Sequence, residues 1–114
     1  MAIDLVDELD DWADAVSTAT GLPVVIDPAR IAPPCLFLDM PETVGVTLGA
    51  LSLTQPVWLV AEGGGRPARD QLLTYLPAVL DALDATAATA GPLNIDGVEW
   101  HAYRIPTPLH VTEE

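Results

Sequence analysis

The sequence predicts an α+β fold, with a mostly antiparallel sheet of about four to six strands and two helices packed on one face. Apolar residues recur at helical spacing in residues 3–20 and 67–83. Apolar, β-branched runs fill residues 23–61 and 93–105. These runs follow one another instead of alternating with helices, which favours antiparallel strands. Residues 1–114 are expected to form one domain, because that length is usual for a single domain.

Residues 3–20 are predicted to form an amphipathic helix. Apolar side chains recur every three or four positions, at Ile3, Val6, Leu9, Trp12, Val16 and Ala19. Acidic side chains follow the same spacing on the other face, at Asp4, Asp7, Asp11 and Asp14. Acids near the start of a helix suit its dipole. Gly21, followed by Pro23, predicts the end of the helix.

The next segment is predicted to contain three or four strands. "PVVIDP" (23–28) and "CLFLD" (35–39) are short apolar runs bounded by prolines. Residues 43–61 are rich in Val, Leu and Thr, and predict two strands or one long bent strand broken near Gly49. Because Pro56 cannot donate to a ladder, it is expected at an edge or a bulge.

A second helix is predicted from Pro67, where the missing N–H is tolerated. Its expected buried stripe is Leu72, Leu73, Leu76, Val79, Leu80 and Leu83. Pro77 lies inside this helix and predicts a kink, since it removes one backbone hydrogen bond. "ATAATAGP" (85–92) is expected to be a flexible connection out of the helix.

A hairpin is predicted around Asp96-Gly97, a dipeptide that suits a type I′ turn. Pro106 and Pro108 follow in the last strand, two positions apart. Their missing N–H groups would point to the same side, so that side of the strand cannot be fully paired.

The charge is strongly acidic, with 17 Asp and Glu residues against four arginines and a net charge of -13. Nucleic-acid binding needs a basic patch, which four scattered arginines hardly provide. Such a surface is typical of an acidic soluble protein, or of one that repels a polyanion or docks a basic partner. No apolar run approaches the ~20 residues of a membrane helix, and the acidic N-terminus does not resemble a signal peptide.

"VWLVAEGGGRPARDQLLTYL" (57–76) has the layout of a phosphate-binding loop, and Gly63, Gly65 and Ala68 fit G-x-G-x-x-A. A dinucleotide fingerprint also needs a second parallel strand with an acid about 20 residues on. That position falls in "ATAATAG", where no strand and no acid is predicted. Pro67 removes an N–H from the helix start, and the chain has no lysine for a Walker loop. The loop is expected to serve as the turn from the strand to the helix, without binding a phosphate.

No residue is predicted to act in catalysis or to bind a metal or cofactor. Ser17 and Ser52 are not in a G-x-S-x-G context, and Cys35 opens an apolar strand where cysteine is usually a small buried hydrophobe. His101 and His110 form no recognised ligand pair. The acidic helix face lacks the EF-hand spacing and is expected to be solvated.

Four segments in order carry a family resemblance: "TGLPVVIDPARIAPPCLFLDMPE", "PVWLVAEGGG", "LLTYLPAVLDALDAT" and "HAYRIPTPLHV". In the order and residue pattern of these segments, the chain resembles the tail terminator proteins of long-tailed, siphovirus-type bacteriophages that infect actinobacteria. The resemblance implies a small structural subunit with no catalytic residues. Such subunits form a hexameric ring at the head-proximal end of the tail tube, terminate tube polymerisation and join the tail to the head.

The resemblance also implies partners and a location. The partners are further copies of the chain in a homohexamer, the major tail tube protein and the head–tail connector or stopper protein. DNA would pass through the ring without specific binding, and no membrane is involved. The protein would lie in the virion tail, and in the host cytoplasm during assembly. The loop expected at a subunit interface comprises Glu62, Gly63, Gly64, Gly65, Arg66 and Arg69.

The expected ring lumen is acidic. The candidates for lining it are Asp4, Asp7, Glu8, Asp10, Asp11, Asp14, Asp39, Glu42 and Glu62. Other function classes stay open: a small acidic dimeric chaperone, another neck protein of the head–tail junction, and an enzyme or nucleotide binder that uses the glycine loop. A solution mass would separate a ring from a dimer.

Overall fold

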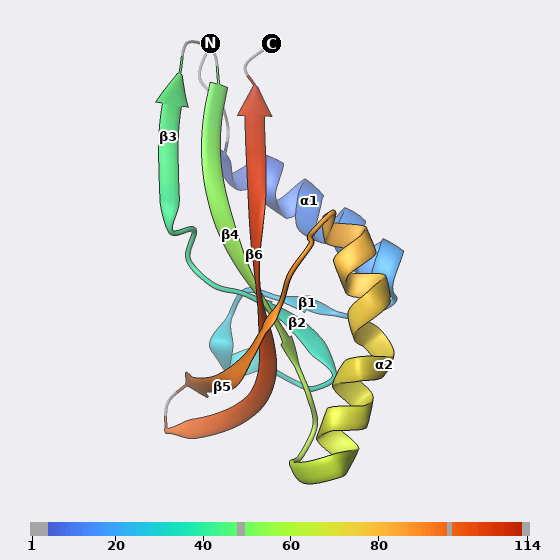
Figure 1. Ribbon diagram of the computed structural model, residues 1–114. Helices are drawn as coiled ribbons and strands as arrows, with labels where there is room; N and C mark the ends of the chain where they lie inside the picture. Colours follow the sequence, from blue (N-terminus) through green and yellow to red (C-terminus); the bar gives the residue numbers. More distant parts are fainter. Residues whose placement is uncertain (1–4, 48–49, 96, 113–114) are drawn as a thin grey trace.

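The computed structural model describes residues 5–47, 50–95 and 97–112, and in it two helices lie on one face of a six-stranded sheet (Figure 1). The elements are α1 (Leu5–Thr20), β1 (Val24–Val25), the 3-10 turn η1 (Pro28–Arg30), β2 (Cys35–Leu38), β3 (Thr43–Thr47), β4 (Ala50–Val60), α2 (Gly65–Leu83), β5 (Thr89–Ile95) and β6 (Val98–Thr112). The strand order is β1-β2-β4-β6-β5, and β3 also pairs with β4. Only β1 and β2 are parallel neighbours, so the predicted α+β class is confirmed.

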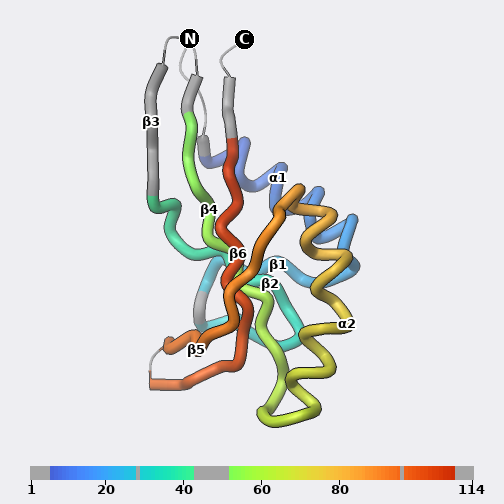
Figure 2. The backbone as a smooth tube through the Cα atoms, in the orientation of Figure 1, coloured from blue at the N-terminus to red at the C-terminus, as the bar shows by residue number. Residues whose placement is uncertain are grey.

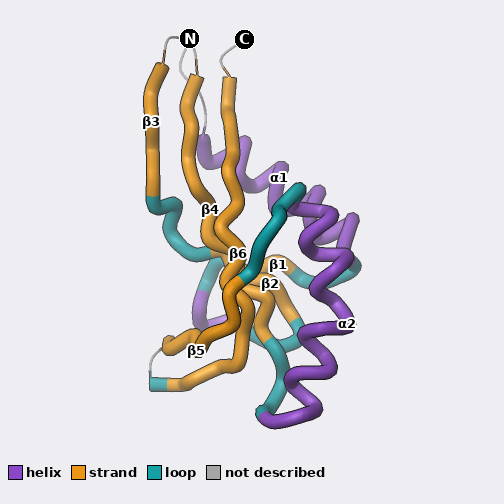
Figure 3. Tube along the Cα trace, viewed as in Figure 1, coloured by secondary structure: helices purple, strands orange, loops and turns teal. Residues whose placement is uncertain are grey.

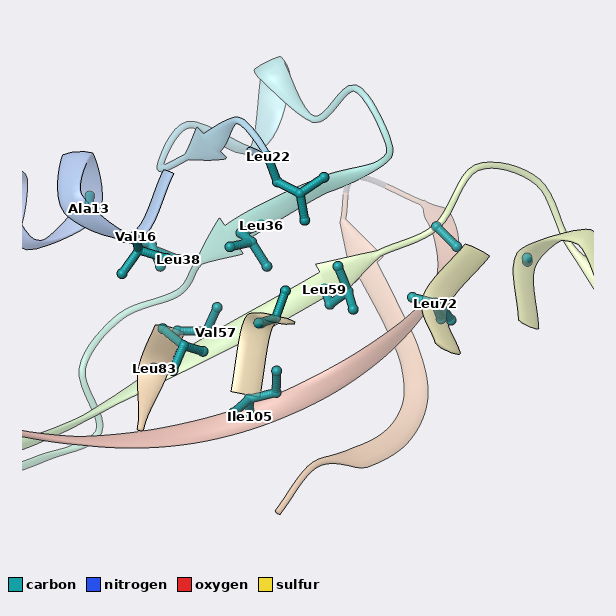
Figure 4. Close-up of a cluster of buried hydrophobic side chains, with 13 residues drawn as sticks. Ala13, Val16, Leu22, Leu36, Leu38, Val57, Leu59, Leu72, Leu83 and Ile105 are labelled. Atoms are coloured by element: carbon teal, nitrogen blue, oxygen red, sulfur yellow. The ribbon is translucent and has the colours of Figure 1, made fainter. Parts of the chain in front are cut away.

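The helix-facing core consists of cross-strand rows. Because side chains alternate along a strand, every second residue of β2, β4 and β6 faces the helices. The rows are Leu38–Val57–Ile105 and Leu36–Leu59–Tyr103. The helices cover them with Ala13, Val16, Ala68, Leu72, Val79 and Leu83. Figure 4 shows these side chains converging between the strands and the helices, and Figure 3 shows both helices on the same side of the sheet.

A second cluster lies on the opposite face of the sheet. Cys35 and Phe37 of β2 are buried there together with Val60, Leu93 and Ala102. Trp58, Trp100 and Ile31 pack against them. Cys35 is fully buried, as its apolar context predicts, and burial raises the pKa of its thiol.

α1 packs against the sheet mainly through its second half. Ala13 and Val16 are buried and Trp12 packs against the core, but Val6 is 68% exposed. The predicted apolar face of the helix is therefore only partly buried, because Val6 and Ala19 are exposed, while Ile3 lies outside the described residues. The helix ends as predicted: Gly21 has φ 72° and its N–H donates to the carbonyl of Ser17.

β4 runs the length of the molecule and changes partners midway (Figure 1). Residues 52–60 of β4 lie beside β6 throughout (Figure 2). Residues 57–60 pair with β2 and residues 50–54 pair with β3. Gln55 and Pro56 fall between these partners, so the proline faces no ladder on that side. The prediction that Pro56 marks an edge or a bulge is wrong for β4 as a whole, because β6 pairs with Pro56 on the other side, but Pro56 does lie at a local gap in the sheet. The buried Gln55 amide donates to the Asp39 and Pro56 carbonyls, at 2.5 and 2.9 Å.

A three-stranded arm extends beyond both helices (Figure 1). We use "the arm" for β3, residues 50–54 of β4 and residues 107–112 of β6. β5 pairs with β6 only as far as Arg104, so no described strand covers the outer edge of residues 105–112. That edge contains Pro106 and Pro108, as predicted. The extents of 49 × 29 × 21 Å reflect this elongated shape.

α2 begins at Gly65, so Pro67 is its third residue, where an N–H would have no partner within the helix. Pro77 lies inside the helix, which continues on both sides of it from Gly65 to Leu83. Leu72, Val79 and Leu83 are buried as predicted. Leu73 is 43% exposed, so its predicted place in the buried stripe is wrong.

The segment after α2 becomes a strand sooner than predicted. β5 begins at Thr89, so the second half of the expected flexible connection, residues 85–92, is wrong. The Gly and Pro within "TAGPLNI" hid the strand signal. The β5–β6 hairpin itself is confirmed. Gly97 has φ 78°, and Asp96 lies outside the described residues.

Candidate functional site

The glycine loop, residues 62–65, links β4 to α2. Gly63 and Gly65 have φ values of 72° and 65°, in the left-handed region that favours glycine. Gly64 between them is extended, with φ -141°. Glycine at 63 and 65 thus allows a sharp turn from strand to helix.

The inner side of the loop packs against its own protein. The N–H of Glu62 donates to Oε1 of Gln71 at 2.7 Å, and the N–H of Ala61 donates to the carbonyl of His101 at 3.0 Å. A Cβ added to Gly64 would lie 3.2 Å from Nε2 of His101. A side chain at 64 would require the imidazole of His101 to shift by a few tenths of an ångström. Glycine thus allows the loop and this imidazole to approach closely, which is a structural reason for "GGG" that requires no phosphate.

The surrounding topology differs from a dinucleotide fold. β4 and β5 are both antiparallel to β6 and hence parallel to each other, so β4–α2–β5 is a βαβ unit. The prediction that "ATAATAG" (85–91) contains no strand is wrong from Thr89 onward. However, β6 lies between the two parallel strands, and β5 (Thr89–Ile95) contains no acidic residue to hold a ribose.

We therefore expect no saturable binding of NAD or ATP. The first reason is that β6 separates the two parallel strands. The second is that Pro67 lacks an N–H in the first turn of α2, where a phosphate would be held. Calorimetry at about millimolar ligand would check this, a range that detects affinities of about -4 kcal/mol. Saturable heat that disappears when Gly64 is replaced by valine would contradict the structural interpretation of the loop.

Gly65→Ala is expected to lower the free energy of unfolding by about 1 kcal/mol, because alanine is strained at a left-handed φ. Gly91→Ala is the matched control. Gly91 lies in β5 with open space where its Cβ would be. Urea denaturation of both variants would check the prediction. Equal stability of the two variants would show that the turn does not need a glycine at 65.

A cavity of about 480 Å³ lies beside the loop, between the start of α2 and the β5–β6 hairpin. Its polar lining comes from Arg69, Glu99, His101 and Tyr103. The lining contains no serine, threonine or cysteine that could act as a nucleophile. No group of three or more metal-ligating side chains occurs among the residues that the structure describes. Ser17 uses its hydroxyl to hold the Leu22 carbonyl at the end of α1.

An apolar groove of about 340 Å³ lies between the first turns of α1 and the end of β2. Val6, Ile26 and Met40 line it and are 68%, 58% and 77% exposed. Leu9, Phe37, Leu38, Pro41, Gln55, Asp10 and Asp39 complete its lining. The sequence pattern did not reveal this surface, because it placed Val6 on the same apolar face as the buried Val16, and spacing alone cannot tell a buried stripe from an exposed one.

The predicted interface residues lie together at one end of the molecule. Glu62, Gly63, Gly64, Gly65, Arg66 and Arg69 are all exposed. They belong to the glycine loop and the first turns of α2, at the opposite end from the arm (Figure 1). Nε of Arg66 lies 3.7 Å from Oδ2 of Asp70, and Nη1 of Arg69 lies 3.9 Å from Oδ1 of the same carboxylate.

The other two arginines are also paired: Arg30 lies 3.9 Å from Asp27, and Arg104 pairs with Glu42. The four arginines therefore do not form a continuous basic patch. The predicted lumen acids Asp7, Glu8, Asp10, Asp11, Asp14, Asp39, Glu42 and Glu62 are all exposed, while Asp4 lies outside the described residues. Most belong to α1, and Glu62 lies at the other end of the molecule.

Within the described ranges, neither helix is long and apolar enough to span a membrane. No protein-family model matches the chain, and no curated protein matches it.

Proposed function

We propose that this chain is a structural subunit of a bacteriophage tail. Six copies form a ring at the head-proximal end of the tail tube, terminate tube polymerisation and join the tail to the head connector. The arm carries this proposal. A small domain rarely extends a sheet with open edges into solvent, because such edges pair with other chains. A ring covers these edges with neighbouring subunits.

The remaining features of the chain agree with an assembly role. The glycine loop is occupied by contacts within the protein, and the cavity beside it is lined by no serine, threonine or cysteine. The apolar groove is an exposed surface of the kind that marks protein–protein contacts. The partners under this proposal are further copies of the chain, the major tail tube protein and the head–tail connector or stopper. The proposed location is the virion tail, after assembly in the host cytoplasm.

The acidic charge fits a ring around DNA. A duplex carries one negative charge per ~1.7 Å of its axis, so a basic lining would hold it through counterion release. Exposed carboxylates on α1 outside the apolar groove, such as those of Asp11 and Asp14, would instead repel it. At moderate ionic strength this repulsion acts within about 10 Å, which is short enough to keep the DNA from adhering without blocking its passage.

The isolated protein is accordingly expected not to shift duplex DNA in a gel, at low or high salt. The physical reason is the net charge of -13 together with arginines that all lie near carboxylates. Binding at about 50 mM salt that disappears at about 200 mM would reveal a basic binding surface, since phosphate contacts weaken steeply over that range. That outcome would contradict the acidic channel.

The solution mass tests the proposed assembly. Light scattering of the chain with isolated tail tubes is expected to find six copies per tube end, from heterologous contacts that close into a ring. A dimer that persists at every concentration, with or without tubes, would contradict the ring. It would favour the alternative of a small acidic dimeric chaperone.

A further inference from the structure

The apolar groove is lined by large hydrophobic side chains that are exposed to solvent. Val6, Ile26 and Met40 are three of the most exposed large hydrophobic side chains among the described residues, and they lie around one depression. Val6 belongs to the helical face that periodicity would bury. Exposed apolar side chains that gather around one groove are a feature of protein–protein contact sites.

The rim of the groove is acidic. Asp10 and Asp39 line it and are exposed, and neither forms an ion pair with any described residue. The floor includes the buried side chains of Phe37 and Leu38. The groove therefore fits an apolar side chain that is flanked by cations.

The outward face of α2 has this composition. We call Arg66, Arg69 and Leu73 the arginine face; they follow helical spacing, so they share one side of the helix. Leu73 is 43% exposed. The two guanidinium groups share the single carboxylate of Asp70. α2 also begins without an acidic first turn and without a side-chain cap, so its positive dipole end adds to this face.

We propose that the arginine face of one copy docks in the apolar groove of a second copy, with Leu73 against Met40 and the arginines near Asp10 and Asp39. Two chains of net charge -13 repel each other, so association needs a face where cations meet unpaired carboxylates. The arginine face and the groove are different surfaces, so the contact is heterologous and can repeat around a ring. This inference rests on the proposed function and names the surfaces that join neighbouring subunits.

Disulfide trapping tests the contact. Leu73→Cys and Met40→Cys are made as separate variants, concentrated, mixed in equal amounts and oxidised. The mixture is expected to give a cross-linked dimer, while each variant alone gives none. The wild-type chain is the background control, because its buried Cys35 thiol is protected. The variant with both substitutions should give a ladder that ends in one closed species.

Three results would overturn this contact. One is a mixture that cross-links no more than either variant alone. The others are efficient dimers of Leu73→Cys alone or of Met40→Cys alone, which would indicate a symmetric contact. If light scattering still finds six copies while 40–73 cross-links are absent, the ring stands and this interface is wrong. A constant dimer instead would contradict the ring itself.

The charges are tested separately. Arg66→Gln with Arg69→Gln is expected to slow cross-linking in the mixture at least about tenfold, because rim charges steer association. Arg30→Gln is the matched control, since Arg30 is also exposed and lies near an aspartate but lines neither surface. Equal cross-linking rates for the Arg66→Gln/Arg69→Gln variant and the Arg30→Gln variant would exclude charge complementarity as the basis of the contact.

Discussion

Leu59→Ala is expected to lower the free energy of unfolding by about 3 kcal/mol. Leu59 is 1% exposed at the centre of the helix-facing core, paired with Leu36 on one side and Tyr103 on the other. Truncation removes buried apolar area and leaves a cavity that the neighbouring strands cannot close. The urea midpoint, compared at equal m-value, measures the loss.

Leu73→Ala is the matched control for this substitution. The same side chain is removed, but from an exposed position on α2, so the change in stability is expected to stay within about 0.5 kcal/mol. Similar losses for both variants would mean that α2 does not pack on the sheet in this orientation. A stable Leu73→Ala protein is also a useful reagent, because the proposed subunit contact depends on Leu73.

Tails assembled without this chain are expected to lose their defined length. Each tube subunit that adds to a growing end presents the same surface again, so heterologous growth has no stop of its own. A ring of a different subunit binds that end and presents another surface. Deletion of the gene followed by electron microscopy should show a broad distribution of long tubes, detached from heads.

Complementation is the control for the tail-length experiment. The wild-type chain supplied from a plasmid should restore a narrow length distribution, and Leu59→Ala should restore it less well at raised temperature. Tails of unchanged length that still join heads after the deletion would contradict a role in termination.

The fold class followed from hydrophobic periodicity, because this pattern depends on local geometry. The spacing of Val16 in α1 and of Leu72 and Val79 in α2 is enforced by a buried face, and all three are buried. The place of Pro56 in the sheet could not be predicted fully. A proline is tolerated there because β2 and β3 leave a gap beside β4, and such a gap is a tertiary feature. β5 was partly missed because its Gly and Pro weaken a local strand signal that pairing with β6 overrides.

The surfaces were harder to predict than the core. Val6 and Leu73 fit helical stripes in the sequence but are exposed in the fold, since a stripe shows which residues share one side of a helix without showing that all of that side is covered. The glycine loop was expected to turn a corner. The contact between Gly64 and His101 could not be foreseen, because 37 positions separate them in the chain.

Averaged electron-microscopy images of tails, with this chain labelled, test the central claim most directly. The ring account predicts six copies around the tube axis at the head-proximal end, in a single layer between the tube and the head connector. A dimer at that position, or tails that contain no copy of the chain, would contradict it.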